Sequence, residues 1–138
     1  MTSKSILLAR IGMILYIAAV AFLCFAHFEK LPDIHKTFLG LEQDKIAHFL
    51  MFLPFPFLSY YAVGKNPSGP WKAIGAVLLI FLTGCLIAAG TELGQSLFPY
   101  RSTDAGDFLS DACALAIASL AVFIIMLVRG TRSVSSDR

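Results

Sequence analysis

Long apolar runs separated by short polar clusters dominate the chain. Four of these runs are long enough to cross the hydrocarbon core of a bilayer, which takes roughly 20 helical residues. They lie at residues 11–28, 46–63, 73–98 and 108–128. Because backbone groups in lipid must satisfy one another, each run is predicted to be a helix. The pattern predicts an all-α, polytopic membrane protein in which residues 1–138 form a single bundle of four transmembrane helices.

The composition supports this prediction and narrows the function. Hydrophobic residues make up 57% of the chain and charged residues 14%, whereas an ordinary soluble domain is about a quarter charged. The net charge of +2 is too balanced for a nucleic-acid partner. Most soluble enzymes are therefore excluded, and membrane lipids are the expected surroundings. Residues 130–138, rich in Ser and Arg, are predicted to form a mobile tail.

The basic residues predict the orientation of the bundle. Seven of them fall on the side that holds both termini, namely Lys4, Arg10, Lys65, Lys72, Arg129, Arg132 and Arg138. Four fall on the other side, Lys30, Lys36, Lys45 and Arg101. Since cytoplasmic loops carry the excess of Lys and Arg, both termini are predicted to be cytoplasmic. All acidic residues except Asp137 lie in or next to the two outer loops, so polar chemistry is expected at the outer membrane face.

The first polar cluster is Asp44, Lys45 and His48, at the outer end of the second run. Spacings of four and three residues place His48 beside the other two on one helical face. Asp44 and Lys45 alone suit an ordinary helix entry, but an imidazole inside an apolar helix needs a partner. Pro54 and Pro56 are expected to bend this span, which either opens a cavity below His48 or only makes a packing kink.

The second cluster lies near the outer end of the third run. Glu92 and Gln95 are three residues apart and are expected to share a face. An ionised carboxylate that faces lipid is costly, so Glu92 is predicted to point inward toward a cation or to be protonated. Gly90 and Gly94 form a small-xxx-small pair that allows a neighbouring helix to approach closely.

The third cluster, Asp104, Asp107 and Asp111, leads into the fourth run. Asp104 suits a helix N-cap, and Asp107 suits the positive end of the helix dipole. Asp111 lies one turn further, inside an otherwise apolar run, so it calls for a different explanation.

Taken together, the three clusters carry a negative excess that cannot be buried uncompensated. The acids are therefore caps in water, protonated carboxyls, or ligands of a cation. The oxygen-rich set suits Mg²⁺ or Ca²⁺ better than zinc, and the His-Glu-x-x-His and Cys-x-x-Cys spacings typical of zinc sites do not occur. The identity of any metal stays open.

These residues resemble the VanZ-like family of membrane proteins. The match rests on Asp44-Lys45-x-x-His48, Glu92-x-x-Gln95, and Pro99-x-Arg101 followed by Asp107, and it covers roughly residues 44–118. The resemblance implies a bacterial cell envelope and, for the family's named member, low-level resistance to the glycopeptide teicoplanin. The expected location is therefore the bacterial inner membrane, and the distribution of basic residues predicts that the polar site faces the periplasm.

The chain departs from the family pattern at two places. Asp111 stands where Asn is common one turn into the last helix, which makes this site more acidic. Ala114 and Ala118 stand where Gly is usual, which implies looser helix contacts.

One hypothesis is a membrane-embedded enzyme or binder that acts on a lipid-linked envelope precursor, or on a glycopeptide, at the outer leaflet. Lys45 and Arg101 would hold a phosphate. The candidate acid–base or ion-binding residues are His48, Glu92, Asp107 and Asp111. The candidate substrate-binding residues are Asp44, Lys45, Gln95, Arg101 and Asp104.

Two other classes of function fit the same residues. In a non-catalytic interaction protein, the ionic network would only lock the four helices together. In a small transporter, the polar residues would line a path, although no internal repeat is visible between the halves of the chain. The sequence leaves open whether the protein is an enzyme.

Overall fold

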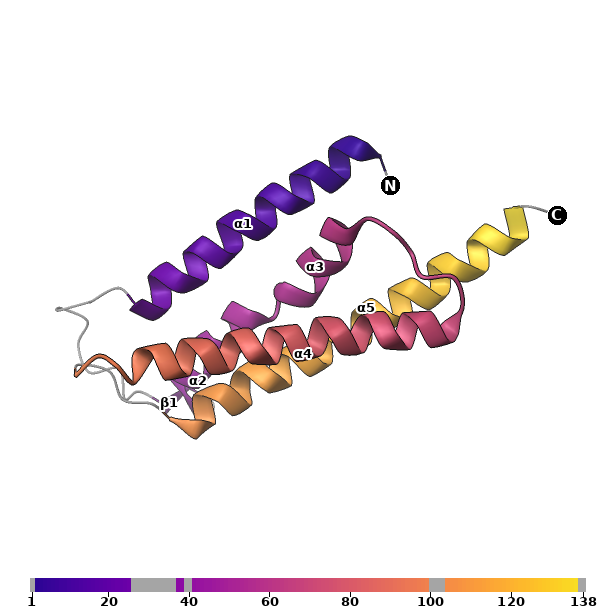
Figure 1. Ribbon diagram of the computed structural model, residues 1–138. Helices are drawn as coiled ribbons and strands as arrows, with labels where there is room; N and C mark the ends of the chain where they lie inside the picture. The colour runs from indigo at the N-terminus through magenta and orange to yellow at the C-terminus, as the bar shows by residue number, and fades with distance from the viewer. Residues whose placement is uncertain (1, 26–36, 39–40, 100–103, 137–138) are drawn as a thin grey trace.

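The computed structural model describes residues 2–25, 37–38, 41–99 and 104–136. It contains five helices and a pair of two-residue strands in this part of the chain (Figure 1). The elements are α1 (Ser3–Phe25), β1 (Thr37–Phe38), β2 (Leu41–Glu42), α2 (Gln43–Phe52), α3 (Phe55–Val63), α4 (Pro70–Gln95) and α5 (Ala105–Ser136). The strands pair antiparallel, with Thr37 opposite Glu42, immediately before α2 begins.

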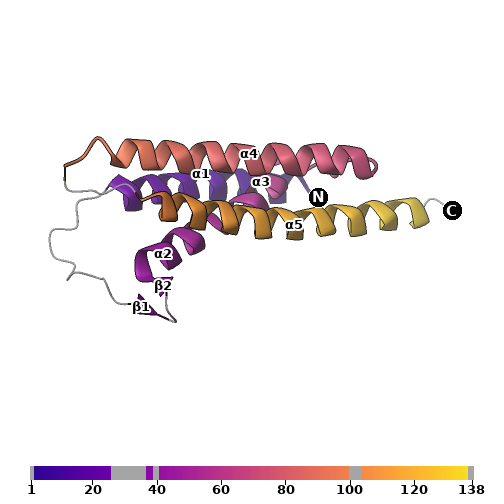
Figure 2. The ribbon, with the colours of Figure 1, turned by 90° about the horizontal axis from the view of Figure 1, so that it is seen from below.

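Four helical segments are long and apolar enough to cross a membrane: Ser3–Phe25, Gln43–Val63, Pro70–Gln95 and Ala105–Gly130. The prediction of an all-α polytopic bundle with four spans is confirmed, and both ends of the described chain lie at the same end of the bundle (Figure 2). Helix α1 begins before residue 11, and α5 continues past residue 128 as far as Ser136. The helices extend beyond the apolar runs because polar residues outside the hydrocarbon keep the same backbone hydrogen bonds.

Helix α5 is the central element, and it packs against α2, α3 and α4. The buried core near the middle of the bundle joins residues from every span: Val20, Cys24, Phe52, Phe55, Ala88, Ala114 and Leu115. Many large apolar side chains on the outside of the bundle are exposed, among them Leu8, Leu15 and Leu86. Such a surface suits lipid, not water.

Small residues set the distance between α4 and α5. A Cβ atom built on Gly84 would lie 2.5 Å from the Leu115 Cδ2 atom and 3.1 Å from the Phe55 Cδ1 atom. The predicted close approach at Gly90 is wrong, because nothing described lies within 4 Å of a Cβ built there. At Gly94 such a Cβ would meet the ring of Phe25 at 2.7 Å. Helix α4 therefore contacts α5 near Gly84 and contacts α1 near Gly94.

The second span is broken between α2 and α3, where the sequence places Pro54 and Pro56. Proline has no N–H to donate, so the break leaves backbone carbonyls without helical partners. One carbonyl in this region, that of Met51, accepts a hydrogen bond of 2.8 Å from the Tyr16 hydroxyl of α1. The predicted bend is confirmed, and α2 runs obliquely to α4 and α5 (Figure 2).

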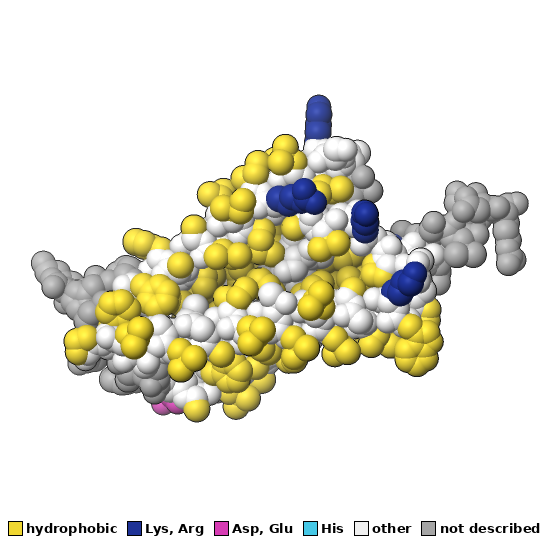
Figure 3. Space-filling model, in the orientation of Figure 1, with side chains coloured by type: hydrophobic (Ala, Val, Ile, Leu, Met, Phe, Trp, Pro, Cys, Tyr) yellow, Lys and Arg dark blue, Asp and Glu magenta, His cyan; other side chains and the backbone are white. Residues whose placement is uncertain are grey.

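Charged side chains are segregated along the bundle. The Lys and Arg side chains visible in Figure 3 lie at the end that holds the N-terminus, and an acidic side chain is visible at the opposite end. At the basic end, the Arg10 guanidinium donates to the Ala62 carbonyl at 3.1 Å, which ties α1 to the end of α3. The polar residues discussed next occupy the other end.

Candidate functional site between α2, α4 and α5

The site is built on the first turns of α2 and α5 and on the last turns of α4. Helix α2 begins directly after β2, and the Asp44 Oδ1 atom accepts a hydrogen bond of 2.9 Å from the Lys45 backbone N–H. His48 follows one turn later, with only 13% of its side chain exposed. Because α2 packs against α5, the imidazole of His48 faces the start of the last helix.

His48 lies among three carboxylates from two other helices. Its Nδ1 atom is 3.2 Å from Asp111 Oδ1 and 3.3 Å from Asp111 Oδ2. The same nitrogen is 3.8 Å from Glu92 Oε1, while Nε2 is 3.9 Å from Asp107 Oδ2. The two ring nitrogens therefore face different acids, Nδ1 toward Glu92 and Asp111 and Nε2 toward Asp107.

The carboxylates are buried and incompletely paired. Asp111 is 0% exposed and Glu92 is 8% exposed. Among the described residues, neither oxygen of Glu92 has a hydrogen-bond partner, and the Asp107 Oδ1 atom also lacks one. Burying a carboxylate without a partner is energetically unfavourable. Binding of protons or of a cation would therefore stabilise this cluster.

A second group of charges covers the site toward the membrane surface. The Lys45 ammonium forms ion pairs with Glu42 and, at 3.1 Å, with Asp104 Oδ2. The Asp104 Oδ1 atom accepts a hydrogen bond of 2.9 Å from the Gly106 backbone N–H, as an N-cap does. This N–H and the neighbouring Lys45 hold the pKa of Asp104 below its usual value. The aliphatic stem of Lys45 lies against Gly106, so a larger side chain at that position would push it away.

The structure thus brings together all four candidate acid–base residues, His48, Glu92, Asp107 and Asp111. Lys45 and Asp104 lie at the rim, and Asp44 is exposed, with its Oδ1 atom accepting from the Lys45 backbone N–H. Gln95 lies apart from the cluster, because its Nε2 atom donates to the Cys24 carbonyl of α1 at 3.1 Å. Arg101 lies outside the described residues.

Sequence reasoning missed Tyr16, whose hydroxyl donates to the Met51 carbonyl at the break in the second span. The sequence signal that could have found it is the single tyrosine hydroxyl inside the first apolar run. Sequence reasoning also missed the polar contacts at the opposite end of the bundle. There the Asn66 amide donates to the Met126 carbonyl at 3.1 Å, and Arg129 lies over the rings of Tyr60 and Tyr61.

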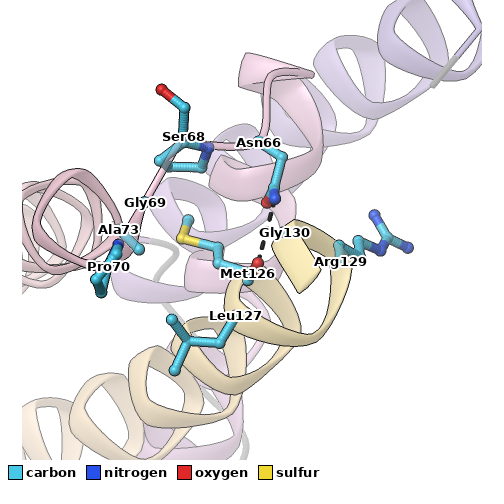
Figure 4. Close-up of a pocket in the computed structure, with 10 residues that line it drawn as sticks. Asn66, Ser68, Gly69, Pro70, Ala73, Met126, Leu127, Arg129 and Gly130 are labelled. Carbon is cyan, nitrogen blue, oxygen red and sulfur yellow. Dashed lines mark hydrogen bonds between the residues drawn. The ribbon is translucent and has the colours of Figure 1, made fainter. Parts of the chain in front are cut away.

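Those contacts adjoin a pocket of about 590 Å³ between the α3–α4 connection and the end of α5 (Figure 4). Its lining includes Pro70, Ala73 and Leu127, and the Arg129 side chain points away from them. Acid, base and imidazole groups do not converge there among the described residues, so the cluster around His48 is the better candidate for chemistry.

Fold and site together define a small polytopic membrane protein with a buried, mainly acidic site at one end of its helix bundle. The chain matches the VanZ/LLP1 family over residues 13–127. Because this match spans most of its length, the protein belongs to that family. Searches of curated proteins and of solved structures each returned no significant match.

Proposed function

We propose that this protein binds and acts on a lipid-linked cell-envelope molecule in the bacterial inner membrane, at the site formed by His48, Glu92, Asp107 and Asp111. The convergence of an imidazole and three buried carboxylates from three helices carries the proposal. A structural lock needs satisfied partners, whereas within the described part of the chain Glu92 and Asp107 keep carboxylate oxygens without a hydrogen-bond partner. Incompletely paired titratable groups in a buried site are typical of binding and catalysis.

The surroundings of the site favour a lipid-linked substrate. Exposed apolar side chains lie on all three helices near it: Leu50 on α2, Leu93 on α4 and Leu109 on α5, with Leu97 just after the end of α4. A molecule with a hydrocarbon anchor can therefore reach the site from within the bilayer. Lys45 at the rim suits the phosphate of a polar headgroup, and the sequence pattern predicts that Arg101 binds the same phosphate.

The cluster offers proton transfer as its chemistry. An imidazole has one nitrogen that can accept a proton and one that can donate it, so His48 can take a proton from one group and give it to another. Glu92, Asp107 and Asp111 would hold the imidazole in place and share its proton. The substrate then needs only to bring its reacting atom within hydrogen-bond reach of this group.

Charge segregation supports a periplasmic site. Lys65 lies in the connection between α3 and α4, Lys72 in the first turn of α4 and Arg129 in the last turns of α5, at the end of the bundle opposite the cluster. Because basic residues mark the cytoplasmic side, the cluster would face the periplasm. The family resemblance implies low-level resistance to teicoplanin, so the teicoplanin resistance of cells that express the protein is a phenotype with which the proposal can be tested.

The experiment uses the full chain in vesicles that contain a polyprenyl-diphosphate-linked saccharide. We expect mass spectrometry to detect conversion or selective retention of this lipid with the wild type, and loss of either effect in His48→Gln and Glu92→Gln. Lys72→Gln, at the opposite end, is the control and should behave as the wild type. If wild-type and Glu92→Gln vesicles return the lipid unchanged and neither protein retains it, the proposal is wrong.

A non-catalytic interaction protein is the second candidate, and two observations favour it. Gln95 ties α4 to α1, and Lys45 joins the start of α2 to Asp104 before α5. These polar residues stabilise helix packing without needing a substrate. The two candidates differ in what they expect of Glu92, because an interaction protein that uses the cluster only as a lock should lose stability when Glu92 is neutralised.

A further inference from the structure

We propose that His48, Glu92 and Asp111 form the binding site of a single transition-metal ion, with Zn²⁺ as the best fit. The inference deepens the proposed function, since it concerns the same site, but metal binding can be measured without any substrate. It rests on the placement of three potential ligand atoms and on a buried carboxylate, that of Glu92, without a hydrogen-bond partner among the described residues.

The geometry suits one ion. One ligand atom from each of the three residues lies within 4.8 Å of the other two. His48 Nδ1 is 3.2 Å from Asp111 Oδ1 and 3.8 Å from Glu92 Oε1. Zinc binds nitrogen and oxygen at about 2.0–2.2 Å, so the ligand atoms of a tetrahedral site lie about 3.2 to 3.7 Å from each other. The distance from His48 to Asp111 falls in this range, and a small movement of the Glu92 side chain would bring its oxygen into it.

Glu92 supplies the second, independent observation. The residue is 8% exposed, it points into the cluster, and among the described residues both of its carboxylate oxygens lack a hydrogen-bond partner. In an apolar bundle this is a costly arrangement unless something positive occupies the space beside it. A divalent ion between Glu92 and Asp111 would neutralise both charges and leave His48 neutral, as a metal ligand must be.

The donor set decides which metal. The oxygen-rich sequence pattern favours Mg²⁺ or Ca²⁺, but here an imidazole nitrogen stands at the centre of the cluster. Imidazole suits zinc and its neighbours, whereas Mg²⁺ and Ca²⁺ prefer oxygen ligands. Three protein ligands leave a position open for water or substrate, as in catalytic zinc sites. Zinc spacings are missing from the sequence because the three ligands come from three different helices.

Asp107 completes the arrangement as a positioning residue. Metal-bound histidines usually donate their other ring N–H to a carboxylate. With Nδ1 directed at the ion, His48 Nε2 faces Asp107 Oδ2 at 3.9 Å. A small movement of either side chain would make this a hydrogen bond, which fixes the tautomer and the direction of the ring.

The test measures binding of the metal alone. The full chain is purified in detergent, stripped with a chelator and titrated with ZnCl₂ by calorimetry, with elemental analysis of the dialysed protein. We expect one zinc per chain, an affinity at least 100-fold weaker in Glu92→Gln, Asp111→Asn and His48→Gln, and a loss of about 10- to 100-fold in Asp107→Asn. Excess Mg²⁺ or Ca²⁺ should not displace zinc.

Glu42→Gln is the matched control, because it makes the same chemical change at the same membrane face outside the cluster. It should bind zinc as the wild type does. If the wild type binds no zinc, or if Glu92→Gln binds it as tightly as Glu42→Gln, the inference is wrong. If a variant fails to fold, the number of zinc ions bound per wild-type chain still tests the inference. If the protein binds zinc but has no effect on the lipid, the metal site stands and the proposed function is wrong. If the protein acts on or retains the lipid but binds no zinc, the proposed function stands and the metal site is wrong.

Discussion

At the scale of single residues, Glu92 and Gln95 show how neighbours on one helix acquire different roles. Three residues correspond to about 300° of helical rotation, so their side chains point about 60° apart. That difference is enough for Gln95 to reach the Cys24 carbonyl on α1 while Glu92 points toward His48 on α2. The sequence spacing predicted a shared face correctly, but it could not tell that two different helices lie along that face.

This contrast predicts opposite effects on stability. Gln95→Leu removes a buried hydrogen bond between helices and should lower the stability of the bundle by roughly 0.5–2 kcal/mol. In metal-free protein, Glu92→Gln removes a buried charge that lacks hydrogen bonds among the described residues, so the melting temperature in detergent should stay the same or rise. Thermal unfolding followed by circular dichroism measures both. A drop for Glu92→Gln as large as that for Gln95→Leu would favour the non-catalytic lock.

Asp104 predicts a pH dependence at the rim of the site. Its pKa is lowered in the folded protein by the Gly106 N–H and by Lys45. A lowered folded-state pKa contributes stability above the unfolded value of about 4 and loses it as the pH falls through the folded pKa. The melting temperature of Asp104→Asn should therefore fall less than that of the wild type between about pH 5 and pH 3. Parallel curves for the two proteins would refute this role.

At the scale of the helices, the break in the second span positions His48. The sequence predicted a bend at Pro54 and Pro56, since proline removes backbone donors. It left open whether the bend opens a cavity or only kinks the helix. In the structure the break directs α2 obliquely toward α5, and Tyr16 satisfies the Met51 carbonyl beside it. That partner could not be predicted, because it lies 35 positions away on another helix.

The close approach of α4 and α5 gives a prediction with an internal control. Gly84→Ala would force the buried Leu115 and Phe55 to move and should destabilise the bundle by about 1–3 kcal/mol. Gly90→Ala adds a methyl group where the described chain leaves open space, so it should be neutral or slightly stabilising. Unfolding in detergent measures the difference between the two variants. Equal effects would show that α4 contacts α5 through another face.

At the scale of the whole molecule, the four spans followed from the lengths of the apolar runs alone. The bilayer imposes this regularity, because each span must satisfy its own backbone. The meeting of three polar clusters was expected from their common membrane face, and the structure places His48, Glu92 and Asp111 together. Which ring nitrogen faces which acid could not be predicted, since it depends on the tilt of α2 and on the helix contacts.

The orientation of the whole bundle can be tested with single cysteines. In a chain whose Cys24, Cys85 and Cys113 are replaced, we expect a membrane-impermeant maleimide to label Asp44→Cys in cells with a permeable outer membrane. Lys65→Cys should be labelled only after the cells are lysed, because basic residues mark the cytoplasmic side. The reverse pattern would place the site in the cytoplasm and remove a lipid-linked periplasmic substrate from consideration.

The most direct measurement for the shared site is cross-linking between α2 and α5. In the cysteine-free background, His48→Cys combined with Asp111→Cys should be cross-linked by a short bifunctional thiol reagent, because the two native side chains meet at 3.2 Å. His48→Cys with Ser119→Cys should not, since Ser119 lies eight residues further along α5, about 12 Å away along its axis. Peptide mapping by mass spectrometry identifies the linkage. Cross-linking of the second pair but not of the first would contradict a common site.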